Sequence, residues 1–297
     1  MKKEINIPFF STENDKLTYL DRYTICDLPK EESIRKMLLK QYGAIIEKDI
    51  NTNIDKTIEV LVLEPHPDDF ALSAMGYIQE NMNVTVLNIF SKMKIDSFTW
   101  SEHININEKE YEDLRLLESK VAIQDILDYD FISLKEESTR ITKKTIQEIQ
   151  RSIIGAVKKI LEEKNFDIIM IPMGIGKHLD HLCIYEAIIN EYANLNIDST
   201  MILYPEYPYA RCKKSYIDRL KEIYEVFDLK ENIVNIESKL QDIVNVISVY
   251  KSQFDDINRE QMLAIVREDG RAISTEYNKE NISLVYYKID GRKVKWK

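Results

Sequence analysis

The amino-acid sequence predicts an α/β fold: a mostly parallel β-sheet with helices on both faces and additions at both ends of the chain. From residue 58 to residue 204, short apolar runs alternate with segments of helical period. Such alternation is typical of parallel sheets. The chain has 297 residues, 44% hydrophobic and 31% charged, which is ordinary for a globular protein with a large core.

Five apolar runs are expected to form strands, at residues 58–63, 84–90, 129–133, 168–171 and 201–204. Four helices are expected between them, at residues 70–79, 107–122, 143–161 and 180–192. The clearest helix is the third, because apolar residues recur in it at spacings of 3 and 4: Ile146, Ile149, Ile153, Val157 and Ile160.

The two ends of the chain have a less regular pattern. Residues 1–57 are interpreted as an N-terminal extension that packs on the main domain, with a helix over residues 31–46. Residues 58–297 form the main domain. Beyond Pro208 we expect a helix over residues 236–253 and a late strand over residues 282–289.

Composition and charge exclude several classes of protein. The net charge of −10 and the pI of about 5.1 argue against a nucleic-acid partner. The three cysteines form no CxxC pattern, so thiolate zinc sites and disulfide frameworks are not expected. No apolar run has the roughly 20 residues needed to span a bilayer, and no signal peptide is visible. A cytoplasmic protein without stable membrane insertion is expected, and a homo-oligomer is compatible with the sequence.

Two short clusters carry three of the four histidines in the chain. The first, His66-Pro67-Asp68-Asp69, follows the first predicted strand, and the second, His178-Leu179-Asp180-His181, follows the fourth. Open α/β sheets place their chemistry where strands end. Either cluster alone could be a helix cap or a solvent-exposed turn. Together they favour one divalent-metal site built from two loops.

Catalytic zinc commonly takes two histidines and one carboxylate and leaves a position for water. His66, Asp69 and His181 supply that set. Asp68 lies between two of these ligands in sequence but remains free, as a general base requires. A bound metal lowers the pKa of water towards about 7, so a carboxylate can accept its proton near neutral pH.

The second cluster offers two further groups. His178 could stabilise a developing oxyanion or protonate a leaving nitrogen. Asp180 could orient His178 or accept a hydrogen bond from a metal ligand. Fe(II) and Co(II) also suit ligands of this kind. The lone His103 is interpreted as a surface or loop residue.

At this point the sequence resembles the PIG-L/LmbE family of metal-dependent N-acetylglucosaminyl deacetylases. The first cluster matches four positions of the family's HPDDE-type motif, and the second matches its H-x-D-H motif. Two further segments fit family patterns: Gly76 and Ile78 fit its Gly-Gly-x-Ile, and Arg115, Glu118 and Ala122 fit its R-x-x-E-x-x-x-A helix. The resemblance covers about residues 58–210.

The resemblance implies a Rossmann-like sheet and one zinc ion per chain on His66, Asp69 and His181. It also implies Asp68 as base and His178 as the electrophilic or acid partner. The implied reaction removes acetyl from an N-acetylated amino sugar or its conjugate. We expect three residues to bind that substrate: Arg115, Glu206 and Tyr209. Residues 204–211 are expected to decide its identity, because they follow a strand end.

Two departures from the family pattern leave alternatives open. The family's Glu after the Asp pair is Phe70 here, and its first Gly is Met75. One alternative is a metal-dependent amidase that acts on a different N-acyl substrate. The other is a catalytically degenerate member that binds a glycan, for which Phe70 is the supporting feature.

Overall fold

A computed structural model describes residues 57–94, 107–192, 198–207, 209–254, 259–276 and 281–292. It also describes four short strands near the start of the chain: β1 (Glu4–Ile5), β2 (Pro8–Phe10), β3 (Leu17–Tyr19) and β4 (Tyr23–Thr24). β1 pairs with β4 and β2 with β3, both antiparallel. The predicted helix over residues 31–46 and the lone His103 lie outside the described residues.

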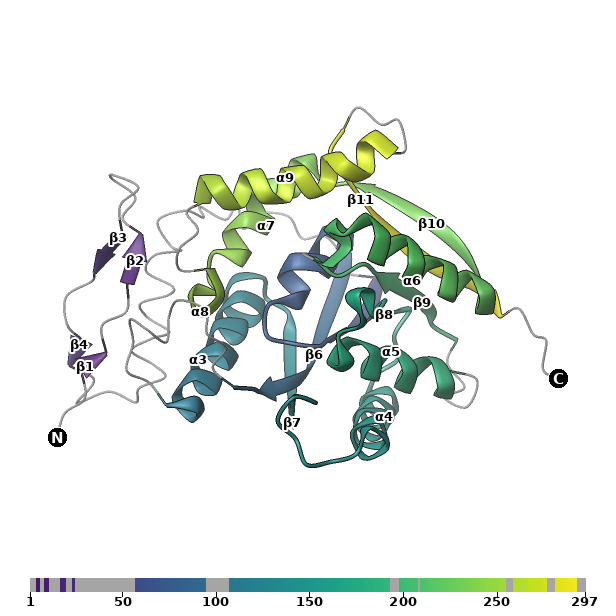
Figure 1. The fold of residues 1–297 in the computed structure, drawn as a ribbon, viewed down its shortest axis with the longest axis horizontal. Coiled ribbons are helices and arrows are strands. Elements are labelled where there is room, and N and C mark those ends of the chain that lie inside the picture. Colours follow the sequence, from purple (N-terminus) through teal and green to yellow (C-terminus); the bar gives the residue numbers. More distant parts are fainter. Residues whose placement is uncertain are drawn as a thin grey trace.

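A seven-stranded sheet forms the centre of the molecule, in the order β10-β11-β9-β8-β5-β6-β7 (Figure 1). Five strands run parallel: β5 (Ile58–Glu64), β6 (Met82–Lys92), β7 (Asp130–Glu137), β8 (Ile168–Pro172) and β9 (Thr200–Tyr204). They include all five predicted strands, so the predicted mostly parallel sheet is confirmed. β10 (Phe227–Asn235) and β11 (Ser283–Arg292) extend one edge antiparallel.

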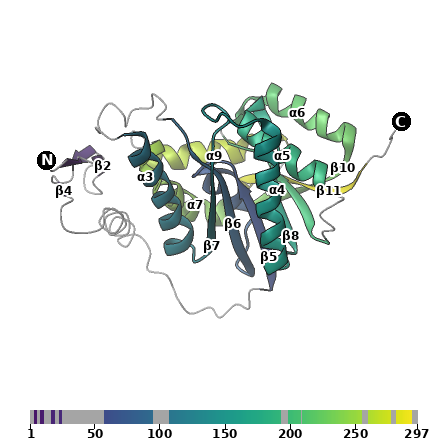
Figure 2. The same cartoon turned by 90° about the horizontal axis from the view of Figure 1, so that it is seen from below.

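Helices cover both faces of the sheet because successive strand residues point to opposite sides. Val60 and Val62 pack on one side with α3 (Glu108–Lys120) and α7 (Leu240–Ile247). Leu61 and Leu63 pack on the other side with the helices α4 (Ile146–Glu163), α5 (Leu179–Glu191) and α6 (Lys213–Val226). Figure 2 shows the two layers on either side of the strands.

Several helical segments differ from the prediction. The segment after β5 is a π-helical turn at Phe70–Ala74 followed by a 3₁₀ turn at Met75–Tyr77. A second π-helical turn, Val121–Ile126, extends α3. A local apolar pattern cannot distinguish such turns from an α-helix, because the apolar spacings nearly coincide.

The predicted single helix over residues 236–253 is wrong. It consists of a 3₁₀ turn (Glu237–Lys239), α7, and a separate short helix α8 (Lys251–Phe254). The hydroxyl of Ser248 donates to the carbonyl oxygen of Val244 at the point where α7 ends. Such side-chain bonds compete with the helical backbone ladder. The sequence pattern also missed α6, β10 and α9 (Arg259–Glu276).

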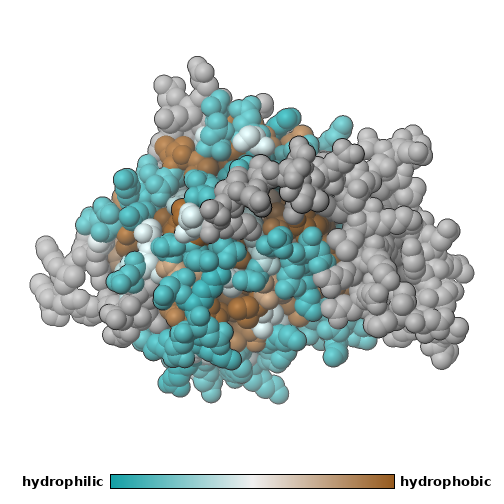
Figure 3. Space-filling view, turned by 180° about the vertical axis from the view of Figure 1, so that it is seen from behind, coloured by the Kyte–Doolittle hydropathy of each residue, from teal (hydrophilic) through white to brown (hydrophobic). Residues whose placement is uncertain are grey.

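The face seen from behind in Figure 3 carries many hydrophilic residues, with hydrophobic areas between them. Scattered exposed apolar residues of this kind are normal. None of the helices in the described part of the chain is long and apolar enough to cross a bilayer.

Candidate metal and catalytic site

The first cluster forms the turn that follows β5. The backbone N–H of Asp69 donates to the carbonyl oxygen of His66 over 3.1 Å, and the N–H of His66 donates to Oδ2 of Asp69 over 2.9 Å. Asp69 makes no side-chain cap to the helical turn that follows. The simple reading of Asp69 as a helix cap therefore has no support in the structure. The turn also gives Asp68 a φ of 132°.

The second cluster begins α5. Two positive-φ residues, Gly174 (79°) and Gly176 (71°), shape the loop after β8, a conformation that glycine adopts without strain. His178 is the N-cap of α5, and its Nδ1 accepts from the N–H of Asp180 over 3.3 Å. His181, one turn further, is completely buried. β5 and β8 are neighbours where the strand order reverses, so the two clusters meet at a topological switch point.

Three atoms from the two clusters form a nearly equilateral triangle. Oδ2 of Asp69 lies 3.3 Å from Nδ1 of His66 and 3.5 Å from Nε2 of His181. The two ring nitrogens are 3.4 Å apart. Tetrahedral zinc with bonds of about 2.0–2.1 Å requires ligand atoms about 3.3–3.4 Å apart. The donor set predicted from the sequence therefore fits a zinc ion.

A set of three histidines is the other candidate for ligation. Ring nitrogens of His66, His178 and His181 all lie within 4.8 Å of one another. A separation of up to 4.8 Å exceeds the distance of about 3.3–3.4 Å between ligand atoms that tetrahedral zinc requires. The edges of the triangle with Asp69 match that distance. We therefore favour the carboxylate-containing set.

The outward nitrogens of His66 and His181, the two histidine ligand candidates, each meet a carboxylate. Nε2 of His66 lies 2.8 Å from Oδ2 of Asp180, and Nδ1 of His181 lies 3.1 Å from Oε1 of Glu206. An ionised carboxylate only accepts hydrogen bonds, so the outward nitrogen of each ring carries a proton. Burial acts to lower the pKa of His66, but hydrogen bonds to Asp180 and Asp69 raise it overall to about 9. A metal at the centre of the triangle would take the place of a proton on the inward nitrogen, as in carboxylate–histidine–metal arrangements.

Asp68 lies beside the triangle and is 8% exposed. Its Oδ1 is 3.2 Å from Nη2 of Arg115, and the same nitrogen donates to the carbonyl oxygen of Pro67 over 2.7 Å. Burial raises the pKa of Asp68 to about 6, against the lowering effect of the Arg115 charge. A carboxyl group with this pKa accepts a proton readily near neutral pH.

His178 and Tyr209 form the more open side of the site. The Tyr209 ring lies 6.0 Å from the ring of His178 and 5.6 Å from that of His181, centroid to centroid. Burial lowers the pKa of His178 to about 4, so its imidazole is neutral at pH 7. Nη2 of Arg140 lies 3.0 Å from Nε2 of His178.

The three expected substrate-binding residues occupy different places. Arg115 and Glu206 are buried, and their contacts are with Asp68 and His181 respectively. Tyr209 is half-buried against the histidines. The geometry thus favours supporting roles for Arg115 and Glu206 and leaves Tyr209 as the residue placed to meet a substrate.

Sequence reasoning missed the loop after β7. Ser138 donates to Oδ2 of Asp180 over 2.7 Å, and the N–H of Thr139 donates to Oδ1 over 2.7 Å. The next residue is Arg140. The sequence signal that could have indicated this loop is that it follows a strand end, as the two histidine clusters do. The predicted strand stopped at residue 133, whereas β7 continues to Glu137.

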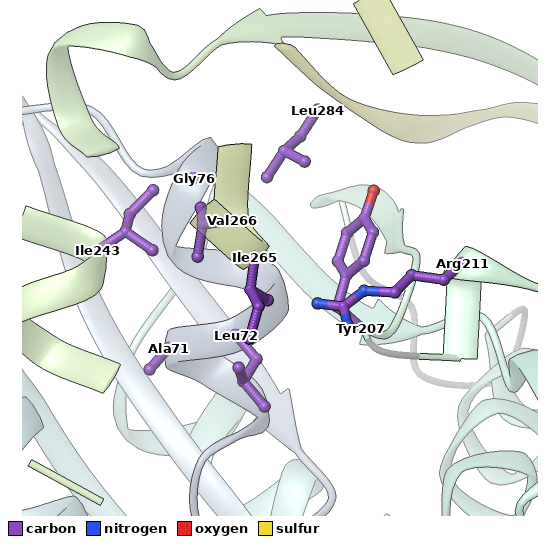
Figure 4. A pocket seen from close by; sticks show the side chains of 9 residues that line it. All are labelled: Ala71, Leu72, Gly76, Tyr207, Arg211, Ile243, Ile265, Val266 and Leu284. Atoms are coloured by element: carbon purple, nitrogen blue, oxygen red, sulfur yellow. The ribbon is translucent and has the colours of Figure 1, made fainter. Parts of the chain in front are cut away.

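A separate hollow lies between the helical turn after β5, α7, α9 and β11. It is lined mainly by apolar side chains, with Tyr207 and Arg211 on one side (Figure 4). None of the ligand or base candidates lines it. The hollow contributes no group to the chemistry of the site.

Comparisons with known proteins bear on the family resemblance and the fold. Residues 61–192 match the PIG-L family, described as GlcNAc-PI de-N-acetylase. A comparison with curated protein sequences gave no match.

Solved structures share the fold. The zinc-inhibited form of teicoplanin deacetylase Orf2 has a TM-score of 0.60 at 14% identity, with 80% of this chain and 100% of that chain covered. The N,N'-diacetylchitobiose deacetylase from Pyrococcus horikoshii has a TM-score of 0.54 at 18% identity, with 89% and 94% covered. The 4-carboxy-2-hydroxymuconate hydratase GalB from Pseudomonas putida has a TM-score of 0.53 at 12% identity, with 81% of this chain and 98% of that chain covered. The resemblance to the PIG-L family that the motifs predicted is therefore confirmed over residues 61–192.

Proposed function

We propose that the protein is a metal-dependent hydrolase that removes the acetyl group from an N-acetylated amino sugar or its conjugate. The observation that carries the proposal is the triangle of His66, Asp69 and His181, with edges of 3.3–3.5 Å, beside the buried carboxyl group of Asp68. This combination would supply a metal site from both clusters with a general base beside it.

The metal proposed for the triangle is zinc. A zinc ion there would polarise the amide carbonyl and lower the pKa of water. Asp180 and Glu206 hold the two imidazole ligands in the tautomer that leaves their inward nitrogens free to bind it.

Asp68 acts as the general base in this proposal. It accepts a proton as water attacks the carbonyl carbon. The C–N bond then breaks, acetate is released, and the proton passes to the amine nitrogen. Arg115 fixes the orientation of the Asp68 carboxyl group through a contact of 3.2 Å.

His178 stabilises the oxyanion that develops on the substrate. A neutral imidazole accepts at one nitrogen only. Nε2 of His178 lies 3.0 Å from Nη2 of Arg140, which can only donate, so the proposal requires the substrate oxygen to displace Arg140. With Nδ1 accepting from the N–H of Asp180, the proton of the neutral ring then lies on Nε2. This N–H is then a donor for the oxyanion or for the leaving nitrogen.

The reaction type rests on the site and the family match, since the fold alone also occurs in the hydratase GalB. The degenerate alternative rests on Phe70, whose side chain is fully buried in the core and lies 6.3 Å from the ring of Tyr129. Phe70 in place of the family's Glu leaves the three ligand candidates, Asp68 and His178 in place. The geometry therefore favours an active enzyme.

Acetate release tests the proposal. The purified protein, loaded with zinc, is incubated with N-acetylglucosamine, N,N'-diacetylchitobiose and a lipid-linked N-acetylglucosamine, and free acetate is measured. We expect release from at least one substrate and a large loss in the His181→Ala variant. Matched N-butanoyl sugars distinguish an amidase for longer acyl groups. No release from any substrate by a protein with one zinc per chain would contradict the proposal.

A further inference from the structure

The buried carboxyl group of Glu64 lies under the turn that carries the candidate base. Glu64 is the last residue of β5 and is 0% exposed. Its Oε1 accepts from the backbone N–H of Asp68 over 3.2 Å and from that of Phe70 over 3.0 Å. Its Oε2 accepts from Nδ2 of Asn88 over 3.0 Å. The proposed chemistry assigns no role to this group.

The backbone of Asp68 needs support from its surroundings. Its φ of 132° lies in a region that residues other than glycine rarely adopt. Such conformations cost of order 1–3 kcal/mol and persist only where neighbouring groups hold them. At Asp68 the N–H is held by Glu64, the carbonyl oxygen accepts from Leu72, and the carboxyl group meets Arg115.

We propose that Glu64 is a positioning residue, which holds Asp68 in its strained conformation and so aims the base at the reacting centre. The inference rests on the proposed function of Asp68. Glu64 acts by accepting two backbone N–H groups at once, and Asn88 holds its second oxygen. A misplacement of a reacting group by about 1 Å can cost about 100-fold in rate.

The same two strands contain a matched control at their other end. Residues Glu64 and Asn88 are paired in register, and so are Glu59 and Asn83. Nδ2 of Asn83 donates to both oxygens of Glu59 over 3.1 and 2.9 Å. Glu59 therefore has the same residue type and the same asparagine partner, but it lies at the end of β5 remote from the turn.

The test compares Glu64→Gln, Glu64→Asp and Glu64→Leu with Glu59→Leu. A Gln side chain has the same length as Glu and keeps one acceptor oxygen for the two backbone N–H groups, so we expect at least a third of the wild-type kcat. Leu removes the acceptor, and Asp withdraws it by one methylene. For both we expect kcat to fall about 10- to 100-fold with KM and zinc content unchanged. Glu59→Leu should change kcat less than threefold.

Two further measurements separate positioning from general stability. If Glu64 acts through Asp68, the double variant Glu64→Asp/Asp68→Ala should be no slower than Asp68→Ala alone. Amide hydrogen exchange should show the Asp68 and Phe70 amides protected in the wild type and Glu64→Gln, and exposed in Glu64→Asp. Exchange needs no substrate, so it decides the inference even where no acetate is released.

Three results would overturn the proposal. The first is Glu64→Asp with kcat within threefold of wild type. The second is Glu64→Gln as slow as Glu64→Leu, which would show that the negative charge matters and the acceptor geometry does not. The third is unchanged exchange of the two amides in Glu64→Asp. If Glu64→Leu does not fold, Glu64→Asp and Glu64→Gln still decide the question.

Discussion

Nε2 of His66 lies 2.8 Å from Oδ2 of Asp180, and this contact joins the two motif clusters across 114 residues of sequence. The same carboxylate also accepts from Ser138 and Thr139 of the loop after β7. Asp180 therefore connects three loops at the carboxyl ends of β5, β7 and β8. Two roles were predicted for Asp180, orientation of His178 and support of a metal ligand. Its side chain contacts His66, which favours the second role, whereas only its backbone N–H meets Nδ1 of His178.

Replacing Asp180 by Ala should weaken zinc binding. The His66 ring would lose the partner that fixes its tautomer and orientation, and loss of such partners typically costs 10- to 100-fold in metal affinity. Competition with a chromophoric chelator measures the dissociation constant. Asp218→Ala, an exposed position on α6, serves as the control. Equal zinc affinity in Asp180→Ala and the wild type would show that His66 needs no such support.

Replacing Asp68 by Ala should retain zinc and abolish most turnover. The side chain does not belong to the ligand triangle, and general-base catalysis typically contributes 10²- to 10⁴-fold. Metal content by mass spectrometry and kcat from acetate release are measured on the same preparation. A rate near that of the wild type would mean that another group accepts the proton.

Glu118 should make the folded state less stable as pH rises. Burial raises its pKa to about 8, from an ordinary value of 4.5. As pH rises, Glu118 therefore loses its proton at a lower pH in the unfolded chain than in the folded protein. Between these two pKa values, folding requires the uptake of a proton. The contribution to stability is complete below pH 4.5 and is lost progressively up to about pH 8, by up to about 1.4 kcal/mol per pH unit.

Glu118→Gln should remove this slope, since Gln resembles the protonated acid and can keep both contacts with Ser252. Denaturant midpoints at pH 5 and pH 8 measure it. Glu136→Gln is a control of opposite sign. Burial acts to raise the pKa of Glu136, but hydrogen bonds from Lys144 and Ser152 lower it overall, so its contribution is lost as pH falls. Equal slopes in the wild type and Glu118→Gln would contradict the assignment.

Much of the parallel sheet could be predicted because β5, β6, β8 and β9 are largely buried on both faces. Residues 168–172 are buried without exception, and such strands appear in a sequence as short continuous apolar runs. β10 was missed for the opposite reason. Among the described strands it lies at the edge of the sheet beside β11, and it keeps polar residues such as Lys230 and Glu231 exposed.

The site was predictable to the extent that its groups are close in sequence. His66, Asp68 and Asp69 share one turn, and their residue types indicate metal chemistry. The long-range contacts that support the site could not be predicted in the same way. Glu206 meets a histidine 25 positions earlier and Arg115 meets a carbonyl oxygen 48 positions earlier. Such contacts depend on how strand ends converge, which local patterns do not determine.

Gly76 and Gly155 should respond in opposite directions to replacement by alanine. A Cβ on Gly76 would lie 2.7 Å from the hydroxyl oxygen of Tyr286 and 2.9 Å from Cδ1 of Leu284, where the helical turn after β5 approaches β11. Gly155 lies on the exposed side of α4 with nothing within 4 Å of its Cβ position.

We expect Gly76→Ala to lower the free energy of unfolding by about 1–3 kcal/mol, the usual cost of overpacking. Gly155→Ala should raise it by about 0.5–1 kcal/mol, because glycine is unfavourable inside a helix. Urea unfolding of both variants measures the two changes under identical conditions. A Gly76→Ala protein as stable as the wild type would mean that Tyr286 and Leu284 can move aside, and that the turn carrying Asp68 and Asp69 is not fixed against β11.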